Sequence, residues 1–145
     1  METVRDLLAH KGEKTVSVSP KNTVLEALTV MKEENIGAVL VLDDAGQIAG
    51  ILSERDYARK VMLVGKSSKD TAVSEIMTKQ VTVISPDNSV EEAMALMSDK
   101  RCRHLPVVDD GRLCGVISIG DVVRAVIHDK EILISQLEHY ISSSL

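Results

Sequence analysis

The sequence predicts a mixed helix-and-strand fold, α/β or α+β, built from two copies of one β-α-β-β-α unit. The first observation is an internal repeat, since the stretch that starts at Thr15 aligns with the stretch that starts at Val81. The second is that "GILSERD", from Gly50, and "GVISIGD", from Gly115, occupy the same place in the two copies. Two long copies indicate a duplication rather than a solenoid, whose units are shorter and more numerous.

Each copy is expected to begin with a short strand, around residues 16–18 and 81–84, that ends at a Ser-Pro pair because proline cannot continue a ladder. An amphipathic helix follows, with Asn22 and Asn88 before it as caps or turn residues. Its apolar positions recur at i, i+3, i+4 and i+7, which is one helix face. They are Val24, Ala27, Leu28 and Met31, matched by Val90, Ala93, Met94 and Met97.

The second half of each copy reads as a hairpin followed by a helix. The runs "AVLVL" and "HLPVV" lead through an Asp-Asp and glycine turn into "QIAGILS" and "RLCGVIS". A Ser-x-x-Asp pattern then marks a helix start, in which serine and aspartate satisfy free backbone donors. The polar connector "SSKDTAVSEIM" is expected to form a short helix before the second copy.

The last helix is expected to run from Asp121 through "IHDKEILISQLEHYI" and to fray at "SSSL". Its apolar residues are more numerous than the exterior of one small domain usually carries. Two interpretations remain open: the helix packs on its own domain, or it helps to bury a dimer interface.

Composition excludes several classes of protein. With 145 residues and 44% hydrophobic residues the chain can bury a core, but its net charge of −5 and near lack of aromatic residues argue against nucleic-acid binding. No apolar run reaches the length of a membrane span, and the N-terminus lacks a signal peptide. Two cysteines are too few for a zinc site or a disulfide framework. These features favour a soluble, cytoplasmic protein.

Catalytic patterns are missing from the sequence. The acidic residues are scattered along helix faces or lie at turns, and the four histidines show no metal-ligand spacing. Neither a P-loop nor a G-x-G-x-x-G motif is present. We therefore expect that the protein is not an enzyme and requires no metal or cofactor.

One order of motifs occurs twice in the chain: Ser-Pro, helix, the strand with "LPVVDD", glycine turn and "GVIS-x-x-D". This order resembles the CBS domain, the family named for cystathionine beta-synthase. The resemblance spans nearly the whole chain and implies CBS repeats at residues 1–67 and 68–145, the second with an extended C-terminal helix. It further implies a tandem pair (a Bateman module) packed with pseudo-twofold symmetry through the sheets, clefts for adenosine-containing ligands, and a homodimer.

In this family the aspartate accepts both ribose hydroxyls, a role that suits one ionised carboxylate. Basic residues and a histidine before the hairpin hold phosphate, and "KRCRHLP" matches that motif in the second repeat. The implied nucleotide-binding residues are Met77, Thr82, Arg103, His104, Pro106, Ser118, Asp121 and, reaching phosphate across the cleft, Arg55. Three plainer interpretations stay open. The Ser-x-x-Asp pattern is a helix cap only, the basic residues form an exposed strand edge that deters aggregation, and Met77 is a core residue.

The first repeat departs from the family pattern. It has "NIGAVL" in place of the basic motif, and Glu54 inside its Ser-x-x-Asp would repel a phosphate. Its site, formed by Gly37, Ala38, Ser53 and Asp56, is expected to be weak, empty or suited to a different nucleoside.

The function that follows from the resemblance is a regulatory module that senses an adenine nucleotide and acts on an unidentified target protein. AMP is the first expectation, and ATP, ADP, NAD and S-adenosylmethionine are possible ligands. The alternative is a protein-interaction or dimerisation module that needs no ligand.

Overall fold

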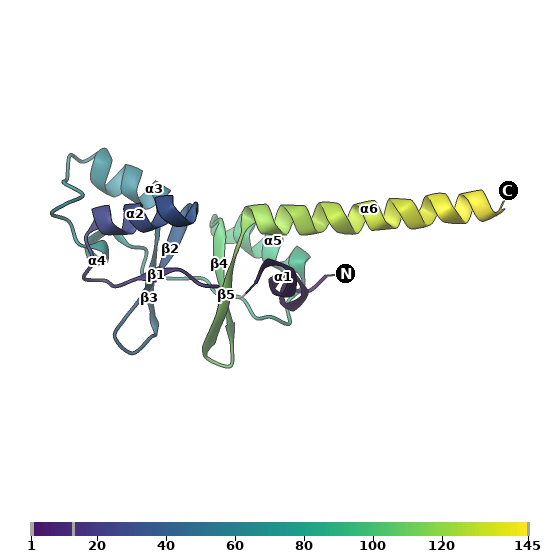
Figure 1. Ribbon diagram of the computed structural model, residues 1–145, viewed down its shortest axis with the longest axis horizontal. Helices are drawn as coiled ribbons and strands as arrows, with labels where there is room; N and C mark the ends of the chain where they lie inside the picture. Colours follow the sequence, from purple (N-terminus) through teal and green to yellow (C-terminus); the bar gives the residue numbers. More distant parts are fainter. Residues whose placement is uncertain (1, 13, 145) are drawn as a thin grey trace. The chain divides into compact units, whose positions relative to one another are not determined.

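The computed structural model describes residues 2–12 and 14–144 and contains both helices and strands, which confirms the mixed α+β class (Figure 1). The elements in chain order are α1 (Val4–Lys11), β1 (Ser17–Val18), α2 (Val24–Glu34), β2 (Ala38–Leu42), β3 (Ile48–Ser53), α3 (Glu54–Tyr57), the π-helix η1 (Ala58–Met62), α4 (Val73–Ile76), α5 (Val90–Lys100), β4 (His104–Asp109), β5 (Arg112–Ser118) and α6 (Ile119–Ser144).

The elements form two compact units, and each unit contains the helix that precedes the other repeat in the sequence. Unit 1 combines the N-terminal segment through Lys14 with the chain from Thr82 onward, and unit 2 is Thr15–Val81. Helix α1, which the sequence pattern did not predict, therefore packs with the second repeat, and α4 packs with the first. The expected division at residue 67 separates the two repeats along the chain. The two compact units have different bounds because of the packing of α1 and α4.

Unit 2 contains a three-stranded sheet in the order β1-β2-β3. Strand β1 runs parallel to β2, and β2 and β3 form the expected antiparallel hairpin. Helix α4 joins this unit through a hydrogen bond from Val73 N to Asn22 O of 2.8 Å and through the buried side chains of Val73 and Ile76.

Unit 1 contains the hairpin β4-β5 in an antiparallel register that pairs His104 with Ser118. The strand expected at residues 81–84 is wrong in extent, because only a parallel bridge between Ile84 and Val107 forms there. The Ile84 backbone bonds to both Pro106 O and Val108 N, and Pro86 follows too soon for the ladder to continue.

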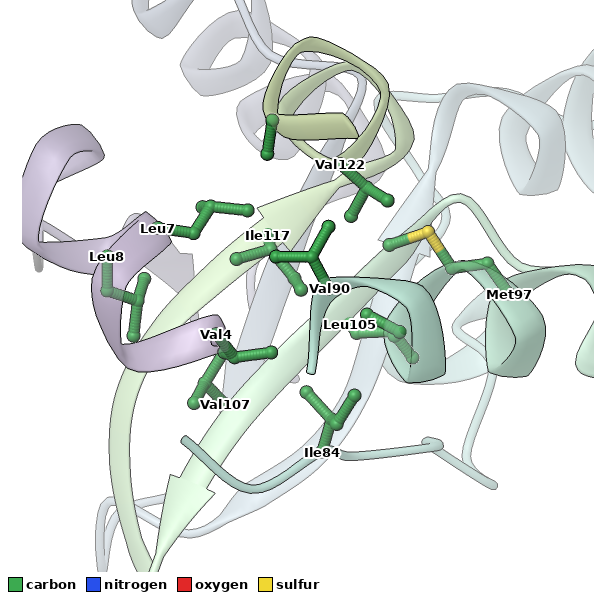
Figure 2. Close-up of a cluster of buried hydrophobic side chains, with 12 residues drawn as sticks. Val4, Leu7, Leu8, Ile84, Val90, Met97, Leu105, Val107, Ile117 and Val122 are labelled. Carbon is green, nitrogen blue, oxygen red and sulfur yellow. The ribbon is translucent and has the colours of Figure 1, made fainter. Parts of the chain in front are cut away.

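The core of unit 1 lies on one face of the β4-β5 hairpin. Figure 2 shows Leu105, Val107 and Ile117 from the hairpin packed with side chains of α1, α5 and α6. Alternate residues of a strand point to opposite sides, so His104, Pro106 and Ser118 lie on the other face. The members of this cluster from outside the hairpin include Val4, Leu7, Leu8, Val90, Met97 and Val122.

The helix starts follow local capping rules. Helices α2 and α5 are capped by Thr23 and Ser89, whose capping boxes use Glu26 and Glu92. Asn22 instead accepts from Ser19 N at 2.8 Å, and Asn88 accepts from Ser85 N at 3.0 Å, so both asparagines are turn residues. Helix α6 begins at Ile119, two residues before the expected start, and its 26 residues continue to Ser144.

Within the part of the chain that the structure describes, no helix combines the length and the apolar character needed to cross a bilayer.

Gly50 offers a test of the packing in unit 2. A Cβ at this position would lie 2.8 Å from both Met77 Sδ and the backbone oxygen of Thr78. Because a backbone oxygen cannot rotate away, Gly50→Ala is expected to lower the free energy of unfolding by about 1–3 kcal/mol in urea denaturation. Gly115→Ala is the control, since the atoms nearest to its Cβ would belong to the side chain of Leu8 rather than to the backbone. Equal losses for the two variants would contradict this packing.

Candidate functional site

The candidate site is built where strand β5 meets helix α6. The Asp121 carboxylate accepts from Ser118 N at 2.8 Å, and the Ser118 hydroxyl accepts from Asp121 N at 3.2 Å. These reciprocal bonds start α6 and hold the carboxylate in one orientation, with the Asp121 side chain 12% exposed. The Ser-x-x-Asp pattern therefore does act as a helix cap, and it also places an acid at a surface hollow.

Two cations meet this carboxylate. Lys11, at the end of α1, donates from Nζ to Asp121 Oδ2 and also to Val116 O at 2.7 Å. Arg124, one turn along α6, donates from Nη2 to Asp121 Oδ1 at 2.9 Å. The sequence interpretation missed both residues. Arg124 could have been found from its i,i+3 spacing, but no local pattern connects Lys11 with an aspartate in the other repeat.

The surroundings determine the charge of Asp121. Burial by itself raises the pKa of a carboxyl group, but the hydrogen bonds from Lys11 and Ser118 outweigh it, and the pKa of Asp121 lies below its ordinary value. The group is therefore a carboxylate at neutral pH and acts only as an acceptor.

A pocket of about 540 Å³ opens beside this carboxylate, between α1 and the start of α6. Its volume lies within the roughly 300–1,000 Å³ of typical small-molecule sites. All of its lining residues belong to unit 1, and they are Glu2, Leu7, His10, Lys11, Asp121, Arg124, Ala125 and His128. Its polar lining combines a lysine, an arginine and two histidines with two acids, Glu2 and Asp121.

The basic motif of the second repeat lies close to the same junction. Arg103 O accepts from Ile119 N at 2.8 Å, and His104 pairs with Ser118 across the hairpin. Pro106 is buried on the same hairpin face as His104, the Arg103 side chain is exposed, and Thr82 is half-buried at the start of this unit's second segment. The backbone of Arg103 and His104 thus lies beside the turn that carries Ser118 and Asp121. None of Arg103, His104 and Ser118 is among the residues that line the pocket beside Asp121.

The remaining two predicted residues of this site belong to unit 2. Arg55 is exposed on α3. Met77 packs against the core of unit 2 and against Gly50, as the core interpretation expected.

The first repeat reproduces the arrangement with a different cation, Lys60, in place of Lys11 and Arg124. Ser53 and Asp56 form the same reciprocal cap, and Ala38 pairs with Ser53 across β2-β3. Asp56 accepts from Thr78 Oγ1 at 3.2 Å and lies 3.2 Å from Lys60 Nζ. A separate hollow of about 360 Å³ is lined by Gly37 and Glu54 and also by Lys32. Ala38, Ser53 and Asp56 are not among its lining residues.

Among the described residues, no group of three or more His, Cys, Asp or Glu side chains is placed to hold a metal ion.

Two repeats of this topology, each with a Ser-x-x-Asp helix start after a hairpin, define the class of protein. A family model described as the CBS domain matches residues 3–63 and 73–128. The chain therefore belongs to the CBS-domain family and is a CBS-domain pair.

Individual relatives agree with this assignment. The chain is 40% identical over 147 residues to "CBS domain-containing protein CBSX3, mitochondrial" of Arabidopsis thaliana, covering 96% of this chain and 71% of that protein. It resembles the solved structure of a protein with CBS domains from Burkholderia ambifaria at 49% identity and a TM-score of 0.84, over 88% and 95% of the two chains. The CBS-domain containing protein ATU1752 from Agrobacterium tumefaciens matches at 41% identity and a TM-score of 0.81, over 85% and 92%.

The lowered pKa of Asp121 predicts how stability depends on pH. A carboxyl group whose folded pKa lies below its unfolded value of 3.8 stabilises the fold fully above pH 3.8, and this contribution is lost as pH falls through the folded pKa. At neutral pH, Asp121→Asn is expected to lower the free energy of unfolding by about 1–3 kcal/mol, as for other charged hydrogen bonds.

The difference in unfolding free energy between wild type and Asp121→Asn should then shrink as pH falls below 3.8 in urea titrations. Asp99→Asn, on the exposed surface of α5, is the matched control. A wild-type advantage that persists unchanged through this range would contradict the role given to Lys11 and Ser118.

Proposed function

We propose that this chain is a regulatory module that binds an adenine nucleotide, AMP foremost, with Asp121 accepting both ribose hydroxyls. The observation that carries the proposal is a fixed, ionised and mostly buried carboxylate at the wall of a pocket of about 540 Å³. A ribose presents two neighbouring O–H donors, and a carboxylate presents two acceptor oxygens at matching spacing. Such charge-assisted bonds are roughly twice as strong as neutral ones.

The cations around Asp121 supply the second half of the recognition. Lys11 and Arg124 form ion pairs with the carboxylate. A nucleotide brings phosphate oxygens as new partners for these cations, while its hydroxyls take their place on Asp121. Asp121 keeps its negative charge in this exchange, and hydrogen bonds from the two hydroxyls and from Ser118 N replace its ion pairs.

The family resemblance favours a different phosphate site, at Arg103 and His104. Lys11 and Arg124 lie near the start of α6, and so do Arg103 and His104. The two pairs come from different elements, since Lys11 belongs to α1 whereas Arg103 precedes β4. Comparing Lys11→Met with Arg103→Met in nucleotide binding separates the two, since only the variant that removes a phosphate contact should weaken AMP more than adenosine.

We assign the regulatory output to α6. Its first turn carries Asp121, so an occupied site alters the environment of the helix that leads away from unit 1. A ligand shifts such an arrangement only by the difference between its affinities for two states. The proposal contains no catalytic step, and the output passes to another polypeptide.

Calorimetry with AMP tests the proposal directly. Wild type should bind AMP, and Asp121→Asn should bind at least about a hundredfold more weakly, because it loses charge-assisted bonds of about 1.5–3 kcal/mol each. Asp99→Asn should bind as wild type does. In excess AMP the wild type should also melt at a higher temperature, since ligand that binds only the folded state stabilises it.

Two results would overturn this function. One is the absence of binding heat with AMP, ADP, ATP, NAD and S-adenosylmethionine. The other is AMP binding of unchanged strength in Asp121→Asn, because a folded protein with that behaviour would use the Ser-x-x-Asp aspartate as a cap alone.

A further inference from the structure

Helix α6 extends far beyond the core that supports its beginning. Val122 and Ala125 are buried in the core of unit 1, but every residue from 130 to 142 is exposed. Figure 1 shows this part of α6 projecting past α1 and α5. An isolated helix of this length is marginally stable in water, since most helical stability in proteins comes from packing of an apolar face.

The projecting part of α6 is also strongly apolar. Its exposed large hydrophobic side chains have roughly half of their surface open to solvent, and they include Ile132, Leu133, Ile134 and Leu137. Contiguous apolar surface of this kind marks an interaction site.

One stripe of α6 has the spacing of a coiled-coil seam. Successive steps of 4, 3, 4, 3 and 4 residues connect its members, Val123, Ile127, Lys130, Ile134, Leu137 and Ile141. In heptad terms the three isoleucines occupy a positions, and Val123, Lys130 and Leu137 occupy d positions. β-Branched residues at a with leucine at d favour two parallel strands.

We propose that α6 pairs in parallel with α6 of a second copy of this chain, through the stripe from Val123 to Ile141. The stripe is available for this pairing because it lies about 100° around the helix from the buried Val122. The inference does not depend on nucleotide binding.

The single charged seam residue fits this partner. In a parallel pair a d side chain packs beside the e position of the other helix, so Lys130 of one copy lies beside Glu131 of the second copy. A polar seam residue of this kind fixes the register of the two helices at some cost in stability.

The charges on α6 argue against a membrane surface as the occupant. Helices that lie on membranes carry lysine and arginine on their polar face. Residues 130–142 of α6 carry two acids, Glu131 and Glu138, against one base, Lys130.

A pair of matched variants tests the seam. Ile134 and Ile132 are 54% and 45% exposed, and they lie about 200° apart around the helix. Sedimentation should give wild type twice the 15.8 kDa of one chain. Ile134→Asp should raise the dimer dissociation constant at least about a hundredfold, since it buries an unpaired charge. Ile132→Asp should remain a dimer.

Disulfide cross-linking tests the orientation. In a background of Cys102→Ala and Cys114→Ala, Ile127→Cys and Leu137→Cys should each cross-link to its own copy under oxidation. His139→Cys, on the opposite face, should not. The two cysteine positions are about 15 Å apart along the helix, and an antiparallel pair brings a residue opposite itself at only one point.

A monomeric wild type, or a dimer that Ile134→Asp leaves intact, would overturn the pairing through this seam. Cross-linking at one of the two positions but not at the other would overturn the parallel orientation. Nucleotide binding by a monomeric Ile134→Asp variant would leave the proposed function standing, so the two proposals fail separately.

Discussion

The reciprocal hydrogen bonds between Ser118 and Asp121 are the constraint on which unit 1 depends. They end β5, start α6 and hold a carboxylate that Lys11 reaches from α1. One short turn therefore joins the hairpin, the last helix and the N-terminal helix. The pocket beside Asp121 lies between two of these elements, α1 and α6. Burial of that acid is tolerated since its oxygens are satisfied by a backbone amide and two cations.

Most of the fold could be predicted from the sequence because its determinants are local and occur twice. Helices α2 and α5, both hairpins and the Ser-x-x-Asp starts follow from apolar periodicity, turn residues and capping. The features that the sequence analysis did not predict depend on contacts between residues far apart in the sequence. Helix α1 is stabilised by the second repeat, where Val4 N donates to Asn88 O, and no pattern within residues 4–11 states that partner. The Lys11–Asp121 pair was not predicted for the same reason. The strand expected at 81–84 is shorter than predicted because of Pro86.

Helix α6 connects the proposed site with the proposed pairing. Asp121 and Arg124 line the pocket, and Val123 and Ile127 lie on the seam within the same two turns. In the proposed function a ligand removes Lys11 and Arg124 from Asp121, at the start of the helix whose far part we propose to pair with a second copy. Such coupling requires only that the two arrangements of α6 differ in affinity for the nucleotide.

The most direct measurement of the central claim is the affinity of AMP against that of 2′-deoxy-AMP, in wild type and in Asp121→Asn. If the carboxylate accepts both hydroxyls, loss of one hydroxyl should weaken binding to wild type by roughly ten- to a hundredfold, because one charge-assisted bond is removed. In Asp121→Asn the same change should have little effect, since the two alterations remove one interaction. Equal affinity of wild type for the two nucleotides would show that Asp121 does not hold the ribose.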